Sequence, residues 1–181
     1  MKGTPFRVLL DYADARWGPL AIEEMIDRAG LARGGAYTAV GDYPPEEFEA
    51  LVSALAGVTG EGHARIYADL GRLTIDRLLL AQSDPVPEEQ SVALALASLP
   101  RMLRQDTKKL YGDTPLPDFD LRHEQGGWII LDVDCRPFTP DFVEGAIRGL
   151  LMRLGKVARI ERSESPCAPS KRVRFRVGSE S

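Results

Sequence analysis

The sequence LPRMLRQDTKKLYGDTPLPDF, residues 99–119, decides how this chain is organised. Leucines recur at helical spacing through its first half: Leu99, Leu103 and Leu110. The helix that they predict ends near Tyr111, because Gly112 and the prolines within 114–117 favour an extended turn. From Phe119 onward, apolar residues recur at every second position instead of at helical spacing. The stretch therefore joins a helical part of the chain to a part that is built on a β-sheet.

Upstream of this stretch, apolar residues recur at helical spacing. They predict helices over residues 5–17, 22–29 and 61–81, one that opens at 44–47, and another over 88–110. The proline-rich run at 83–87 is the clearest break in the chain. We place a boundary there, so that residues 1–84 form a helical subdomain and residues 85–181 form an α+β subdomain. The two together are predicted to make one domain.

Downstream of residue 119 the apolar period is two, which is typical of strands. Gly126 and Gly127 predict a hairpin turn after the first strand. The inward face of the second strand carries Ile129, Leu131, Val133 and Cys135, and its outward face carries Trp128, Ile130, Asp132 and Asp134. A helix with Thr139 as its N-cap follows, and two more strands close the chain. The predicted fold class is α+β: a helical N-terminal subdomain packed on a C-terminal subdomain of helices and a four-stranded antiparallel sheet.

The composition excludes several classes of function. The 181 residues are 44% hydrophobic and 28% charged, with a net charge of −4, so nothing argues for binding to nucleic acid or to a membrane surface. No apolar run approaches the roughly 20 residues that span a bilayer, and the first residues lack a signal-peptide pattern. We expect a cytoplasmic protein with reduced thiols. No Ser-His-Asp set, metal cluster or phosphate loop stands out, so we do not expect an enzyme.

Four stretches of the chain, in the same order and with compatible spacing, resemble haem-nitric oxide/oxygen-binding (H-NOX) domains. They are MKGT at 1–4, GGAYT at 34–38, LYGDTPLPDF at 110–119 and FVEGAIRGL at 142–150. The resemblance covers essentially the whole chain. It implies the H-NOX fold, a haem cofactor and a sensory or regulatory role, because members of this family signal gas occupancy to a partner such as a kinase or a cyclase.

The resemblance also implies which residues surround the haem. In that family a histidine seven residues before the tyrosine of the third stretch ligates the iron. The corresponding residue here is Arg104, whose guanidinium has no free lone pair for a metal. The family's Tyr-x-Ser-x-Arg motif, which binds the two haem propionates, falls on Val133, Cys135 and Pro137, and Pro117 matches the proline that presses on the macrocycle. These residue types lead us to expect that haem is absent or weakly bound.

Other assignments of the haem ligands follow from the same residues. A register shifted by one would align Asp132, Asp134 and Arg136 with the propionate motif, but two carboxylates would then repel two propionates. We therefore prefer the register that uses Val133. Cysteine can ligate haem, so Cys135 is an alternative iron ligand. The two histidines, His63 and His123, are expected to be surface or hydrogen-bonded side chains.

Two further functions stay open at this point. The pocket could bind another apolar small molecule or tetrapyrrole, or it could be filled, leaving a protein-interaction domain. Arg104 either pairs with an acid such as Asp106 and reaches solvent, or it faces an anionic ligand. A basic stripe either binds an acidic partner or forms a solvated sheet face balanced by acids on neighbouring strands, and we favour the second interpretation. The stripe comprises Lys171, Arg172, Arg174 and Arg176, with Arg159 and Arg162 as further candidates, and the acids are Asp132, Asp134, Glu161 and Glu164.

Overall fold

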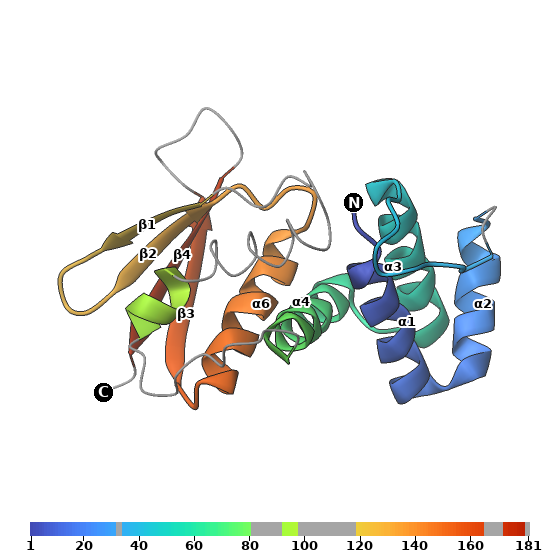
Figure 1. Ribbon diagram of the computed structural model, residues 1–181, viewed down its shortest axis with the longest axis horizontal. Helices are drawn as coiled ribbons and strands as arrows, with labels where there is room; N and C mark the ends of the chain where they lie inside the picture. The colour runs from blue at the N-terminus through green and yellow to red at the C-terminus, as the bar shows by residue number, and fades with distance from the viewer. Residues whose placement is uncertain (32–33, 81–91, 98–118, 165–171, 180–181) are drawn as a thin grey trace.

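The computed structural model describes residues 1–31, 34–80, 92–97, 119–164 and 172–179 (Figure 1). The helices are α1 (Thr4–Trp17), α2 (Pro19–Ala29), α3 (Pro45–Thr59), α4 (His63–Leu80) and α6 (Pro140–Arg153), and residues 92–97 are also helical. The strands are β1 (Phe119–His123), β2 (Ile129–Val133), β3 (Ala158–Glu164) and β4 (Val173–Ser179). Helices α1 to α3 lie at one end of the molecule and the sheet lies at the other, with α4 and α6 between them.

Prolines mark the starts of the N-terminal helices, and glycines follow their ends. Helices α1, α2 and α3 each have a proline in the first turn, where the missing N–H removes no helical hydrogen bond. Gly30 and Gly60 follow α2 and α3 with φ angles of 62° and 72°, a left-handed conformation that glycine adopts readily. These helices enclose an aromatic centre, in which the Phe6 ring lies 4.4 Å from that of Tyr37. The helices predicted over 5–17, 22–29 and 61–81 are confirmed.

The four strands form one antiparallel sheet in the order β1-β2-β4-β3. In its register, Leu131 of β2 lies opposite Leu121 of β1 and Phe175 of β4. Asp132 lies opposite Asp120 and Arg174, so it faces the other side of the sheet. The predicted division of β2 into an inward and an outward face is therefore confirmed, and so is the α+β fold class.

Helix α6 covers the inward face of the sheet. It begins at the predicted cap, where the Thr139 hydroxyl accepts a hydrogen bond of 3.3 Å from the backbone N–H of Phe142. The apolar core between α6 and the sheet also takes in residues from α4 and from the helical segment 92–97. Its buried members include Ile75, Ala95, Leu96, Leu131, Val133, Cys135, Ile147, Leu150, Phe175 and Val177.

Helices α4 and α6 cross at backbone contact. A Cβ atom on Gly71 would lie 1.9 Å from the carbonyl oxygen of Phe142, and one on Gly145 would lie 2.0 Å from that of Ala68. Only glycine permits this approach. Helix α4 also contributes Leu70 to the N-terminal core and Ile75 to the sheet-side core, so this crossing joins the two halves of the protein.

Some of the predictions concern residues outside the described ranges. The predicted boundary at 83–87 is one of them, so the division into two subdomains remains a prediction. The helix predicted over 88–110 is described only at 92–97, where it is helical.

Candidate functional site

Two of the four predicted pocket residues, Val133 and Cys135, lie on the inward face of the sheet. Val133 is 3% exposed and Cys135 is 5% exposed, and both pack into the core beneath α6. The Cys135 thiol lies 3.8 Å from the backbone carbonyl oxygen of Val133. Their predicted inward orientation is confirmed. The other two, Arg104 and Pro117, lie outside the described residues.

The environment of Cys135 disfavours its thiolate. Burial is the main cause that raises the pKa of this thiol to about 12, and the negative charge of Asp134 adds to it. The positive charge of Arg162 acts in the opposite direction. Because a thiolate is the form of cysteine that binds metals, Cys135 in this environment is a poor iron ligand at neutral pH.

The residues of the shifted register lie elsewhere. Arg136 donates to the Asp134 carboxylate through Nε at 2.9 Å and Nη2 at 2.5 Å, and its side chain is 77% exposed. The hydrogen bonds from Arg136 lower the pKa of Asp134 to about 2. Asp132 lies on the outward face of the sheet. Which of the two registers aligns with the propionate motif remains a prediction.

Acids on neighbouring strands balance the basic stripe, as predicted, but Asp120 and Glu124 take part in place of the predicted Asp134 and Glu164, and Lys171 lies outside the described residues. Two further details also differ. Across the outward face the pairs are Arg172–Asp120, Arg174–Asp132, Arg176–Glu124, Arg176–Glu161 and Arg159–Glu161. Asp132 is not solvated: its side chain is 3% exposed, because arginines from both neighbouring strands cover it. Arg162 does not belong to the stripe, because it lies opposite Phe175 on the inward face and pairs there with Asp141 of α6 at 2.6 Å.

Both histidines are exposed, as predicted: His63 lies at the start of α4 and His123 at the end of β1. Within the described ranges, no group of three or more His, Cys, Asp or Glu side chains could hold a metal ion. None of the helices in the described part of the chain is long and apolar enough to cross a membrane.

A cleft of about 620 Å³, which the sequence did not predict, lies between α1 and α4. Its apolar lining consists of Val8, Ala15, Leu73 and Leu80. Its charged lining consists of Asp11, Arg16, Arg65, Asp69, Arg72, Asp76 and Arg77. The volume lies in the range of small-molecule sites, but the mixed charges on its walls set it apart from an apolar pocket.

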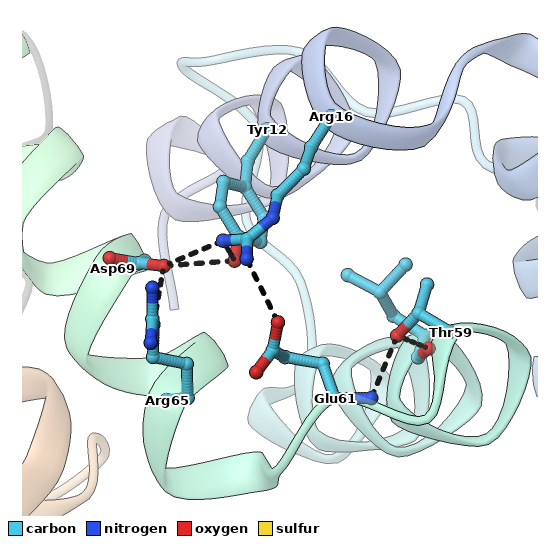
Figure 2. Close-up of polar contacts among 7 residues, drawn as sticks. Tyr12, Arg16, Thr59, Glu61, Arg65 and Asp69 are labelled. Carbon is cyan, nitrogen blue, oxygen red and sulfur yellow. Dashed lines mark hydrogen bonds and ion pairs between the residues drawn. The ribbon is translucent and has the colours of Figure 1, made fainter.

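Polar side chains join the two walls of this cleft (Figure 2). The carboxylate of Asp69 accepts hydrogen bonds from the Tyr12 hydroxyl at 3.0 Å and from Arg16 at 3.2 Å, and Arg65 lies 3.5 Å away. Arg16 also donates to Glu61 at 2.9 Å. Burial, followed by the hydrogen bond to Asp69, raises the pKa of Tyr12 to about 12. This cluster binds α1 to α4 and to the turn that precedes α4.

The sequence held only local signs of this cluster. Tyr12 and Arg16 are one turn apart on α1, and Arg65 and Asp69 are one turn apart on α4, so each pair shares a helix face. Nothing in the sequence indicated that these two faces would meet.

Comparison with known proteins identifies the fold. The sequence matches the Haem-NO-binding family over residues 2–161. A mutant of the K. algicida H-NOX protein in the Fe(II) unliganded state superposes with a TM-score of 0.86 at 19% identity, covering 100% of this chain and 97% of that chain. A mutant S. oneidensis H-NOX protein in the Fe(II) state gives a TM-score of 0.83 at 17% identity, with the same coverage. The Shewanella woodyi H-NOX bound to IWP-051 in the Fe(II)CO state gives 0.78 at 22%, covering 99% of this chain and 95% of that chain.

No curated protein matches the sequence. The family match extends over most of the chain, and the solved H-NOX structures share its helices and its four-stranded sheet. On this evidence the chain belongs to the Haem-NO-binding family and has the H-NOX fold.

Proposed function

We propose that this protein is a sensory or regulatory domain of the H-NOX type whose haem site has diverged, so that haem is absent or weakly bound. The fold of the family supports the sensory role, and the residues at the implied haem contacts support the divergence. Such a domain acts by changing its contacts with a signalling protein partner, and it carries no catalytic machinery of its own. The partner and a cytoplasmic location are parts of this proposal.

One observation carries the proposal: Val133 and Cys135 are buried in an apolar core at the positions implied for the propionate clamp. Propionates are stabilised by charge-assisted hydrogen bonds, and neither of these side chains offers a charged donor. Arg136, the nearest arginine in sequence, is largely exposed and is paired with Asp134. Arg162, the inward-facing arginine of β3, is paired with Asp141. The described residues therefore do not fit the propionates of a haem.

The close packing around Val133 and Cys135 favours one alternative. Both belong to one buried apolar cluster with Ile75, Leu96 and Phe175, and a buried cluster of this kind supports a pocket that side chains fill. A domain filled in this way would serve protein interactions alone. A pocket that takes another apolar small molecule or tetrapyrrole is the remaining alternative, and it depends on residues outside the described ranges.

The absorption spectrum of the protein purified from cells supplied with haem tests the proposal. We expect no stoichiometric Soret band. A strong Soret band, with the signature of an axial histidine or thiolate, would show that the haem site is intact and that the implied ligands are wrong. Titration of haem into the purified protein separates failure to bind from failure to load in the cell.

A rescue series makes the test sharper. Arg104→His supplies the missing axial nitrogen, and Val133→Tyr, Cys135→Ser and Pro137→Arg supply the clamp. The axial change alone should give weak haem binding, and the fourfold variant should bind much more tightly, since each charge-assisted hydrogen bond contributes about 1.5–3 kcal/mol.

The tyrosine of this series enters a packed core, at a cost of about 1–3 kcal/mol in stability. Circular dichroism must therefore show that the fourfold variant is folded. A folded fourfold variant without haem uptake would favour the protein-interaction domain.

A further inference from the structure

Two charged residues on the α4 wall of the cleft differ from the other charged residues that line it. Asp11, Arg16, Arg65, Asp69 and Arg77 each take part in an ion pair. The side chains of Arg72 and Asp76, which are both half-buried, make no ion pair or hydrogen bond with any residue in the described part of the chain.

Residues four apart on a helix are neighbours, so an arginine and an aspartate at this spacing can readily pair with each other. In this structure they do not. The cleft side of α4 therefore presents a cation, Arg72, and an anion, Asp76, that no residue within the described ranges engages.

The spacing of these two charges makes the surface complementary to itself. With a rise of 1.5 Å per residue, the two positions lie about 6 Å apart along the helix axis. A two-fold axis that passes between the two positions relates α4 to an antiparallel α4 of a second copy. Arg72 of each copy then lies opposite Asp76 of the other copy. This is the arrangement of an isologous interface, in which one contact occurs twice.

The geometry points to a two-fold dimer in which α4 packs antiparallel against α4 of a second copy, with Arg72 of each copy paired with Asp76 of the other. An exposed apolar residue supports this contact: Leu80 is 62% exposed and lies one turn beyond Asp76 on the same wall of the cleft. Burial of Leu80 against the second copy removes apolar surface from water and lowers the local dielectric around the ion pairs. The contact is small, so we expect a weak dimer that dissociates into monomers on dilution. This inference does not depend on haem.

Sedimentation velocity over a concentration series of the full chain tests the dimer. We expect reversible self-association that weakens as salt is added, because the ion pairs lie near the surface. In a dimer of Arg72→Glu, the new glutamate of each copy faces Asp76 of the other copy. In a dimer of Asp76→Arg, the new arginine of each copy faces Arg72 of the other copy. Each single variant should raise the dissociation constant at least about tenfold, because like charges across an interface disfavour it.

A mixture of the two single variants gives a result that only reciprocal pairing predicts. In the heterodimer, Glu at 72 faces Arg at 76 and Arg72 faces Asp76, so both ion pairs are complementary again. The mixture should therefore associate more tightly than either variant does alone. Arg153→Glu, which makes the same charge change at an exposed position of α6, should leave association unchanged. Thermal melts followed by circular dichroism verify that each variant is folded.

Two results would overturn the inference. A wild-type chain that stays monomeric at every concentration has no such dimer. A dimer that is unaffected by both single variants uses another surface. Because the haem titration and the sedimentation experiment have separate readouts, failure of this inference leaves the proposed function untouched.

Discussion

Asp132 of β2 accepts two hydrogen bonds from the guanidinium of Arg174 on β4, each 2.8 Å long. Arg122 of β1 pairs with the same carboxylate from the other side. One buried acid thus ties three adjacent strands together on the outward face of the sheet. A carboxylate with so little access to water is stable only while it keeps such partners.

We expect Asp132→Asn to destabilise the fold by about 3 kcal/mol, because it leaves two arginines without their shared anion. Asp120→Asn is the matched control on the neighbouring strand. Asp120 pairs with Arg172 at 2.6 Å, but its side chain is 69% exposed, so its loss should cost less than about 1 kcal/mol. Urea unfolding of both variants measures the difference. Equal effects would mean that the burial of Asp132 has no energetic consequence.

Gly71→Ala tests the crossing of α4 and α6. The new Cβ atom would meet the backbone of Phe142, which cannot move aside as a flexible side chain would. We expect a loss of about 3 kcal/mol in the free energy of unfolding, at the upper end of overpacking effects. Gly57→Ala, in the exposed face of α3, meets only the end of the Arg28 side chain at 3.3 Å. It should stabilise the protein by up to about 1 kcal/mol, since alanine favours helix over glycine. A tolerated alanine at Gly71 would contradict the close crossing.

The pKa of Tyr12 predicts how stability depends on alkaline pH. Burial and the hydrogen bond to Asp69 raise this pKa from 10.0 in the unfolded chain to about 12 in the folded protein. A raised pKa means that the stabilisation is complete below pH 10 and is lost as the pH rises to about 12. In Tyr12→Phe this part of the decline should be missing.

Denaturant unfolding of the wild type and of Tyr12→Phe across this pH range measures the effect. Tyr67, whose pKa burial also raises to about 12, provides a second tyrosine for comparison. If the two curves stay parallel, the hydroxyl of Tyr12 does not contribute through its ionisation.

Cys135 should resist alkylation in the native protein. Its thiol is buried and its pKa is about 12, so almost no thiolate is present at neutral pH. In a Cys167→Ser background, labelling of Cys135 by iodoacetamide should be negligible in buffer and complete in denaturant. Rapid labelling of the folded protein would show that the core beneath α6 opens or contains an accessible cavity.

The sequence by itself determined the local structure and the side-chain faces. The helical spacing of apolar residues in the first half and the change to a two-residue period after residue 119 are local signals, and they marked helices and strands that the structure contains. The alternation in β2 separated Val133 and Cys135 from Asp132, because adjacent residues of a strand must face opposite sides. These signals concern neighbours in the chain, so they can be read without knowing what packs against them.

Only the tertiary structure decided which faces meet. The backbone contact of Gly71 with Phe142, the cover of arginines over Asp132 and the joining of Tyr12 to Asp69 all involve residues far apart in the sequence. The burial of Asp132 escaped prediction because an outward charge on a strand is ordinarily solvated. Its burial depends on the strand order β1-β2-β4-β3, which puts one arginine on each side of it. Strand order and helix crossings arise from packing between segments that are far apart in the chain. The pattern of residues along the chain does not indicate which of these segments contact each other.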